Sequence, residues 1–437
     1  MIRWCFLVSL GILLPFHAIG QQANNLTSDE QLGRPYVALF DTFNLPSSPR
    51  DVKLLRPAIE HDRKQEIQNC EKNKKHLQSQ LESVRGGLKV LNTSAPRDTP
   101  TMAASRDDLH RNITALEQIL RDKKRECEHT LPATYELKLA KVRLLEEWPK
   151  RREETIQKIE EGRARERKHG DVDDIGYRKL VDEQEKDITV GQQAVRQITS
   201  SKLTPIEVQD SAARNYIQDL ASNLARNSDL RIPVHTTLLD SPEVNAIGLP
   251  GGFILVTSGL LLATQTEAEL AGVLSQQIAH IAARHATRTS KRSIIAKMFV
   301  PAAQVATGLF TGGVSNAGVY YGMNYGFQGM GILVDRGLVS SNADAQREAD
   351  QLGIQYAWKA GFDPRGFVAF LDSVARSKEF SKTETFVVTK PPLDERLLHA
   401  FTEIQYLPSK ATYRRDSAEF GKVKQALAAS IAPSVSQ

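Results

Sequence analysis

Apolar residues recur every three or four positions along the N-terminal part of the chain, among many Glu, Lys, Arg and Gln residues. This spacing forms one stripe along a helix and is typical of a coiled-coil seam. Two such runs are separated by residues 92–101, whose prolines cannot continue a helix. The first run is Ile67, Cys70, Lys74, Leu77, Leu81, Val84, Leu88 and Leu91, and the second is Leu109, Ile113, Leu116, Leu120, Lys123 and Cys127. The pattern predicts an antiparallel helical hairpin within a coiled-coil arm over residues 53–200, with further helices over about 133–168 and 174–199.

Beyond residue 203 the pattern alternates between strands and helices. Residues 231–240 are expected to form a strand, and residues 251–264 a strand that leads into a helix. Residues 267–287 and 345–360 have helical periodicity, as do later stretches. We therefore predict an α+β fold, mainly α, in which a domain with a small sheet occupies residues 203–430 and a short tail follows at 431–437.

Composition narrows the class of partner. The chain has 437 residues, of which 41% are hydrophobic and 25% charged, and this suits a soluble globular protein with a long polar helical part. The formal net charge of +5 is small for this length. Basic residues on solvated helix faces account for it, so we expect no nucleic-acid partner.

The first twenty residues have the pattern of a secretory signal peptide. Arg3 precedes an apolar core over residues 4–16, and small residues follow before Gln21. Cleavage is expected near Gly20, which leaves residues 21–52 as an extended lead-in. The apolar run is short for a membrane span, and an uncleaved anchor is the alternative. We expect an exported protein, either periplasmic or secreted.

Two of the three cysteines remain after such a cleavage. Cys70 and Cys127 both lie on the predicted seam, at similar distances from the turn between the two helices. An exported protein meets conditions that permit disulfides. We predict a Cys70–Cys127 disulfide that closes the hairpin; two buried free thiols are the alternative.

Four motifs follow one another in the second region. They are "NAIGLPGGFILVTSGLL" at 245–261, "EAELAGVLSQQIAHIAARHA" at 267–286, "QREADQLGIQYAWKAGFDPRG" at 346–366 and "TKPPLDERL" at 389–397. In this order and spacing they resemble the gluzincin metallopeptidase family of the CAAX prenyl protease, the HtpX-type proteases and the periplasmic β-barrel assembly-enhancing protease. The resemblance covers about residues 203–430 and implies a zincin-like metallopeptidase domain. It says nothing about the arm.

The residues that this family uses for chemistry are replaced here at most positions. Its zinc helix carries His-Glu-x-x-His, in which the two His bind zinc and the Glu is the general base. A later Glu is the third ligand, an Asp four residues on orients a ligand His, and a His before Pro lines the site. The matching residues, in that order, are Gln276, Gln277, His280, Gln346, Asp350 and Lys390.

These replacements remove the base and most of the metal ligands. Gln277 cannot take a proton from water at neutral pH, and an amide oxygen is a poor zinc ligand beside imidazole. His280 is the only retained ligand position, so we expect no catalytic residue and no bound cofactor, although the family uses zinc. On continuous helices Glu348 lies about 200° round from Gln346, and His285 about 140° round from His280. Neither is expected to replace a lost ligand; a relocated zinc site is the alternative.

The sequence therefore favours an inactive pseudoprotease that acts as a binding, scaffold or quality-control protein of the cell envelope, with proteins or peptides as partners. The alternative is an active zinc metalloendopeptidase with a rearranged site. One candidate surface is a strand that pairs with a peptide, and an ordinary sheet strand is its alternative; its residues are Gly251, Gly252, Phe253, Ile254, Leu255 and Val256. Residues 298–334 are a candidate flap over the site or a candidate membrane-surface contact; a helical hairpin packed inside the domain is the alternative. The arm is a candidate seam for a homo-oligomer, or packs only within the chain.

Overall fold

The computed structural model describes residues 49–94, 99–200, 205–242, 244–288, 343–376 and 393–431. The predicted signal peptide and tail, nearly all of the lead-in, Lys390 and the segment 298–334 lie outside these residues. The described chain is mainly helical with one small mixed sheet, and the predicted fold class is confirmed. None of the described helices is long and apolar enough to cross a membrane.

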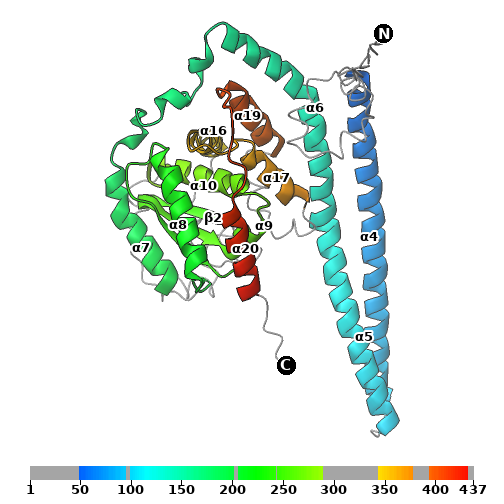
Figure 1. Cartoon of the computed structure of the whole chain (residues 1–437). Helices are drawn as coiled ribbons and strands as arrows, with labels where there is room; N and C mark the ends of the chain where they lie inside the picture. The colour runs from blue at the N-terminus through cyan, green and yellow to red at the C-terminus, as the bar shows by residue number, and fades with distance from the viewer. Residues whose placement is uncertain are drawn as a thin grey trace, which may run out of the picture.

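The arm is a hairpin of long helices (Figure 1). Helix α4 (Pro49–Ser94) lies beside α5 (Pro100–Arg125), which continues through a π-helical turn (Glu126–Thr130) into α6 (Leu131–Glu160). The predicted seam positions of both runs are all buried or half-buried, whereas most residues between them are exposed. The spacing of apolar residues thus gave the hairpin correctly, and supercoiling of its helices stays a prediction.

A disulfide and ion pairs join the helices of the hairpin. Cys70 and Cys127 form the predicted disulfide, with their Cα atoms 5.6 Å apart. Lys74, the charged residue of the first run, pairs with Glu71 at 2.7 Å and with Glu128 at 3.3 Å. The lysine is tolerated on the seam because its ammonium group reaches carboxylates on both helices.

Helix α6 belongs to the arm and to the second region at once. Its buried apolar side chains between Tyr135 and Trp148 belong to the same hydrophobic core as those of the helices after residue 205. Trp148 is fully buried, with its ring centroid 5.4 Å from that of Phe401, and Arg143 forms an ion pair with Asp394. The expected division near residue 200 is therefore not a boundary of the core.

The connection after α6 differs from the predicted helices. Helix α6 ends at Glu160, and short 3-10 turns make up about half of the stretch up to α7 (Ile188–Ser200). Gly162, Gly170 and Gly176 have φ angles of 72°, 76° and 96°, which an α-helix does not allow. The helix expected over 133–168 therefore ends at Glu160, and the helix expected over 174–199 begins only at Ile188.

Three strands form the sheet, in the order β1-β3-β2. The central strand β3 (Phe253–Thr257) runs parallel to β1 (His235–Leu239) and antiparallel to β2 (Ala246–Leu249). Helices α7 and α8 (Ser211–Arg226) pack on β3 and β1, while α10 (Glu267–Ala282) packs against β2. The strand-to-helix step into α9 (Ser258–Ala263) is as predicted.

Helix α10 is the centre of the second region (Figure 1). All of its residues except His280 are buried. It contacts α8, α16 (Ala343–Lys359) and α17 (Gly366–Arg376). Helix α19 (Leu393–Tyr406) packs between α16 and α6, and α20 (Ala418–Ile431) packs on α8 and α9.

Candidate functional site

Helices α10 and α16 approach each other closely at Gly353. A Cβ atom at this position would lie 2.7 Å from the Cα atom of Gln276, so glycine is what allows the two backbones to come this near. The contact places Gln276 and Gln277 of α10 opposite Gln346 and Asp350 of α16, and all four side chains are buried. The structure thus brings together residues that the sequence separates by about seventy positions.

Asp350 is the acceptor at the centre of this group. Its Oδ1 accepts hydrogen bonds from Nε2 of Gln276 at 3.0 Å and from Nε2 of Gln346 at 2.9 Å. Arg396 of α19 donates from Nη2 to Oδ1 at 2.9 Å and from Nε to Oδ2 at 2.8 Å. Arg396 is 1% exposed and Asp350 2% exposed, so water does not screen this ion pair.

Gln277 extends the network to the sheet. Its Nε2 donates to Oε1 of Gln276 at 2.6 Å, and its Oε1 accepts from the backbone N–H of Gly248 in β2 at 2.8 Å. That N–H faces α10 and not β3. The side chain at the expected general-base position therefore accepts a hydrogen bond from a backbone N–H on the outer edge of β2. The amide nitrogen and oxygen of both Gln276 and Gln277 have hydrogen-bond partners.

His280 faces a second cluster, which the sequence reasoning missed. Helix α10 ends at Ala282, and Arg284 adopts a φ of 54°, so the helix does not continue to His285. The turn brings Nδ1 of His285 to 2.9 Å from Nδ1 of His280, and Nε2 of His285 to 3.0 Å from Oε2 of Glu348. The expectation that His285 points away from His280 is wrong, because it assumed one unbroken helix.

Two pKa shifts fix charges in this second cluster. Burial alone would raise the pKa of Glu348, but hydrogen bonds with His169 and His285 lower it well below its ordinary value. Burial lowers the pKa of His280 well below its ordinary value, and the charges of His285 and Arg396 act in the same direction. At neutral pH an ionised carboxylate therefore lies near a neutral His280.

Neither cluster offers a donor set that suits zinc. His285 uses one ring nitrogen toward His280 and the other toward Glu348, so these three side chains do not converge on one point. Around Asp350, the amide nitrogens and the guanidinium present N–H donors, which cannot bind a cation. In the described part of the chain, no group of three or more His, Cys, Asp or Glu side chains is placed to hold a metal ion.

The sequence of the region that contains this site matches a known protein family. The sequence profile of peptidase family M48 matches residues 211–404, which include β1 to β3, α10, α16 and most of α19. Residues 211–404 are a peptidase family M48 domain. M48 peptidases are zinc-dependent, whereas the amides and the guanidinium around Asp350 offer zinc no suitable donor set.

Named relatives agree with this assignment. A beta-barrel assembly-enhancing protease from Yersinia pestis is 28% identical over 242 residues, which cover 55% of this chain and 48% of that protein. The protein of the same name from Escherichia coli K12 is 25% identical over 230 residues, with 49% and 42% covered. The mitochondrial metalloendopeptidase OMA1 of Schizosaccharomyces pombe is 27% identical over 173 residues, with 39% and 46% covered. The matched part of this chain thus spans about half the length of these relatives.

The predicted peptide-binding strand is not at an edge of the sheet. Gly251 and Gly252 lie in a 3-10 turn, and Phe253 to Val256 lie in β3, which has β1 on one side and β2 on the other. Residues 251–256 therefore cannot accept a further strand, and this expectation is wrong. Sequence alternation marks a strand but not its place in the sheet, so β2 was not recognised as the outer strand.

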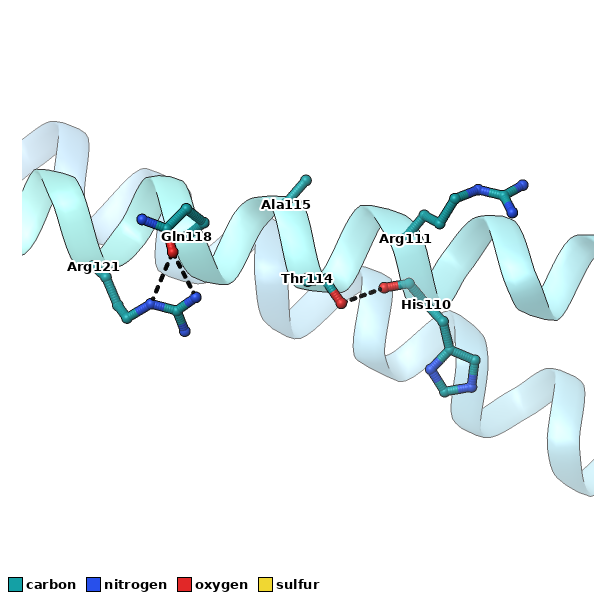
Figure 2. Close-up of a pocket in the computed structure, with 6 residues that line it drawn as sticks. All are labelled: His110, Arg111, Thr114, Ala115, Gln118 and Arg121. Carbon is teal, nitrogen blue, oxygen red and sulfur yellow. Dashed lines mark hydrogen bonds between the residues drawn. The ribbon is translucent and has the colours of Figure 1, made fainter. Parts of the chain in front are cut away.

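A shallow hollow of about 550 Å³ lies on the arm, away from the M48 domain. Figure 2 shows that its lining comes from one helix, α5; the residues are His110, Arg111, Thr114, Ala115, Gln118 and Arg121. Gln118 accepts a hydrogen bond from Arg121 at 2.8 Å, and Thr114 donates to the backbone of His110 at 3.0 Å. This is one face of a helix, and it brings together no group of residues suited to chemistry.

Proposed function

We propose that this protein is a catalytically inactive M48 pseudoprotease that binds proteins or peptides of the cell envelope as a scaffold or quality-control factor. The hydrogen-bonded network from Gly248 through Gln277 and Gln276 to Asp350 carries the proposal. It fills the positions of the base and first ligand with amides whose hydrogen-bonding groups already have partners.

The network supports binding without chemistry in two ways. A site that lacked only its metal would leave buried carboxylates without a counter-charge, at a cost of several kcal/mol. Here Gln277 and Gln346 stand where the family has acids, and the remaining acid, Asp350, is paired with Arg396. The domain is therefore stable as it stands, and an envelope location follows from the predicted signal peptide and the named relatives.

An active zinc endopeptidase is the alternative, and one observation favours it. His169, His280 and His285 lie near Glu348, and these are residue types that bind zinc. A rearrangement of these side chains around a metal would create a site that the present hydrogen bonds do not form.

Zinc content and proteolysis together test the proposal. The mature chain and the variant Gln276→His/Gln277→Glu/Gln346→Glu would be incubated with zinc, desalted and measured for metal per chain and for cleavage of an unfolded protein. We expect the natural chain to stay empty and inactive, and the variant to retain about one zinc because it regains the ligand set of the family. Thermal unfolding of both chains controls for loss of the fold.

A natural chain that holds one zinc and cleaves substrate would overturn the proposal. In that case His285→Ala and Glu348→Gln would identify the ligands, because both should then release the metal. The binding role is tested separately, by whether the natural chain slows aggregation of an unfolded outer-membrane protein at stoichiometric amounts. No effect there would leave the inactive site in place and remove the binding role.

A further inference from the structure

A cleft with a cationic lining lies between the arm and the M48 domain. It has a volume of about 320 Å³ and is bounded by α6, the connection after it, α16 and α19. Its lining carries six cationic side chains against two carboxylates. The cations are Arg151, Lys158, Arg163, Arg167, Lys168 and Arg347. A hollow of this size holds a small ligand or the headgroup of a larger one.

The charges of the cleft are only partly neutralised by the protein. Arg163 pairs with Glu161 and Glu166, and Arg347 with Asp344 and Glu395. In contrast, Arg151 and Lys158 form no ion pair with any carboxylate of the described residues. They are seven positions apart, which places both on one face of α6 about 10 Å from each other along its axis. Their long side chains can reach one ligand in the cleft.

A buried guanidinium in the same cleft has one donor to spare. The side chain of Arg167 is 9% exposed; its Nη1 donates to Oε1 of Glu403 at 2.8 Å, and its Nη2 lies 2.5 Å from Oδ1 of Asp171. Its Nε is buried and has no acceptor within the described residues. Leaving a charged donor unsatisfied is costly, so an acceptor oxygen from a ligand would stabilise this arrangement.

The neighbouring aromatic and imidazole groups also suit an anion. The ring of Tyr406 lies 4.5 Å from the guanidinium carbon of Arg167 and fixes its plane. Burial lowers the pKa of His399, and the positive charges of Arg151 and Arg347 lower it further. The cleft is therefore positive toward its contents without a charge on His399.

We propose that this cleft binds a phosphate group of a phosphorylated ligand, with Arg151 and Lys158 supplying charge and Arg167 supplying one directed N–H donor from Nε. Arginine matches the oxygens of phosphate with its planar fork of donors, and lysine adds a mobile point charge. Excess positive charge favours phosphate, which carries more than one negative charge as a monoester, over a single carboxylate. This role is independent of whether the M48 site binds zinc.

Titration calorimetry of pyrophosphate binding to the full chain tests the site. Arg151→Gln/Lys158→Gln is the variant of choice, because both residues are exposed and unpaired and their loss should leave the fold intact. Lys150→Gln/Arg165→Gln is the matched control: it removes the same charge nearby, from residues that do not line the cleft. We expect about tenfold or more weaker binding in the first variant and less than about twofold change in the second.

Vesicles distinguish a lipid headgroup from a soluble phosphate ester. Flotation with phosphatidylcholine vesicles containing one-third phosphatidic acid would be compared with flotation on phosphatidylcholine alone. Flotation that requires phosphatidic acid and is lost in the cleft variant alone supports a lipid phosphate; cleft-dependent pyrophosphate binding without flotation supports a soluble ester. The proposal would be overturned if both variants lost pyrophosphate binding equally or if neither pyrophosphate nor the vesicles bound. Citrate that binds as tightly as pyrophosphate would also overturn it.

Discussion

At the scale of single residues, the buried pair Asp350–Arg396 organises the site. Sequence motifs placed Gln276 and Gln277 on one helix and Gln346 on another, and the structure joins all three to Asp350 in one hydrogen-bonded network. The motifs did not reveal Arg396, whose partner lies 46 positions away. The only signal was an arginine at a position where α19 faces the core, and such an arginine needs a carboxylate.

Removing this arginine should destabilise the fold strongly. Arg396→Met leaves Asp350 buried without its counter-charge, and we expect a loss of about 3–5 kcal/mol in the free energy of unfolding, measured with urea. Arg347→Met breaks a half-exposed pair with Glu395 and should cost about 1 kcal/mol or less. The double variant Arg396→Met/Asp350→Leu should recover part of the loss; if it is as unstable as Arg396→Met, the unpaired charge is not the cause.

Glu403 gives a test of pH dependence at the same scale. Burial raises the pKa of Glu403 to about 7, although Arg167 and Gln355 act against this, whereas an unfolded Glu has a pKa of about 4.3. The folded state therefore holds the proton more tightly, and this stabilisation is lost as the pH rises from about 4.3 to about 7.

Glu403→Gln removes the pH-dependent loss of stability that the ionisation of Glu403 causes. We expect the stability of this variant relative to the natural chain to rise between mildly acidic and mildly alkaline pH, by at most about 3 kcal/mol. Urea unfolding across the pH range measures it. Glu166→Gln, an exposed change in the same cleft, should show no comparable rise. A parallel pH profile for Glu403→Gln and the natural chain would contradict the assignment.

At the scale of elements, breaks in helices decided which predictions failed. The apolar seam of the arm was predictable because its period runs without interruption through both helices. The end of α10 was not, because Arg284 is an ordinary residue for a helix and only its φ of 54° shows the turn. That single turn moves His285 from the far side of a helix to a contact with His280.

The close approach of α10 and α16 can be tested at Gly353. A methyl group there would meet the backbone of Gln276 at 2.7 Å, so Gly353→Ala must separate the helices and should cost about 1–3 kcal/mol. Gly421 in α20 has no atom within 4 Å of an added Cβ, and Gly421→Ala should stabilise the chain by about 0.5–1 kcal/mol through helix propensity. Urea unfolding of both variants gives the comparison; equal effects would mean that the two helices are not in tight contact.

At the scale of the whole molecule, the arm is joined to the M48 domain through α6. The sequence predicted both parts and divided them near residue 200, where the pattern of apolar positions changes. Trp148 and its neighbours on α6 are nevertheless buried in the core shared with α19. Side chains that fill a common core leave no mark in the composition on either side of it.

The disulfide sets the stability of the free end of this arm. It closes a loop of 57 residues, for which chain entropy predicts about 4 kcal/mol of stabilisation. In the natural chain, we expect a reducing agent to lower the unfolding temperature of the helices. Circular dichroism measures this temperature. Cys70→Ser/Cys127→Ser should start at the lower temperature and not respond to the reducing agent; a response in this variant would point to another cause.

The hydrogen-bonded amides between α10 and α16 also restrict how this chain could regain protease activity during evolution. Gln276→His, Gln277→Glu and Gln346→Glu each need one nucleotide change, but a metal site gains affinity only when several ligands are present together. Gln346→Glu alone would place a second carboxylate against Asp350, and Gln277→Glu alone would add a buried charge without a metal to bind. Either of these first steps lowers stability before it restores any activity. We therefore expect reversion to proteolysis to be blocked in practice, and natural selection to act on what the protein binds.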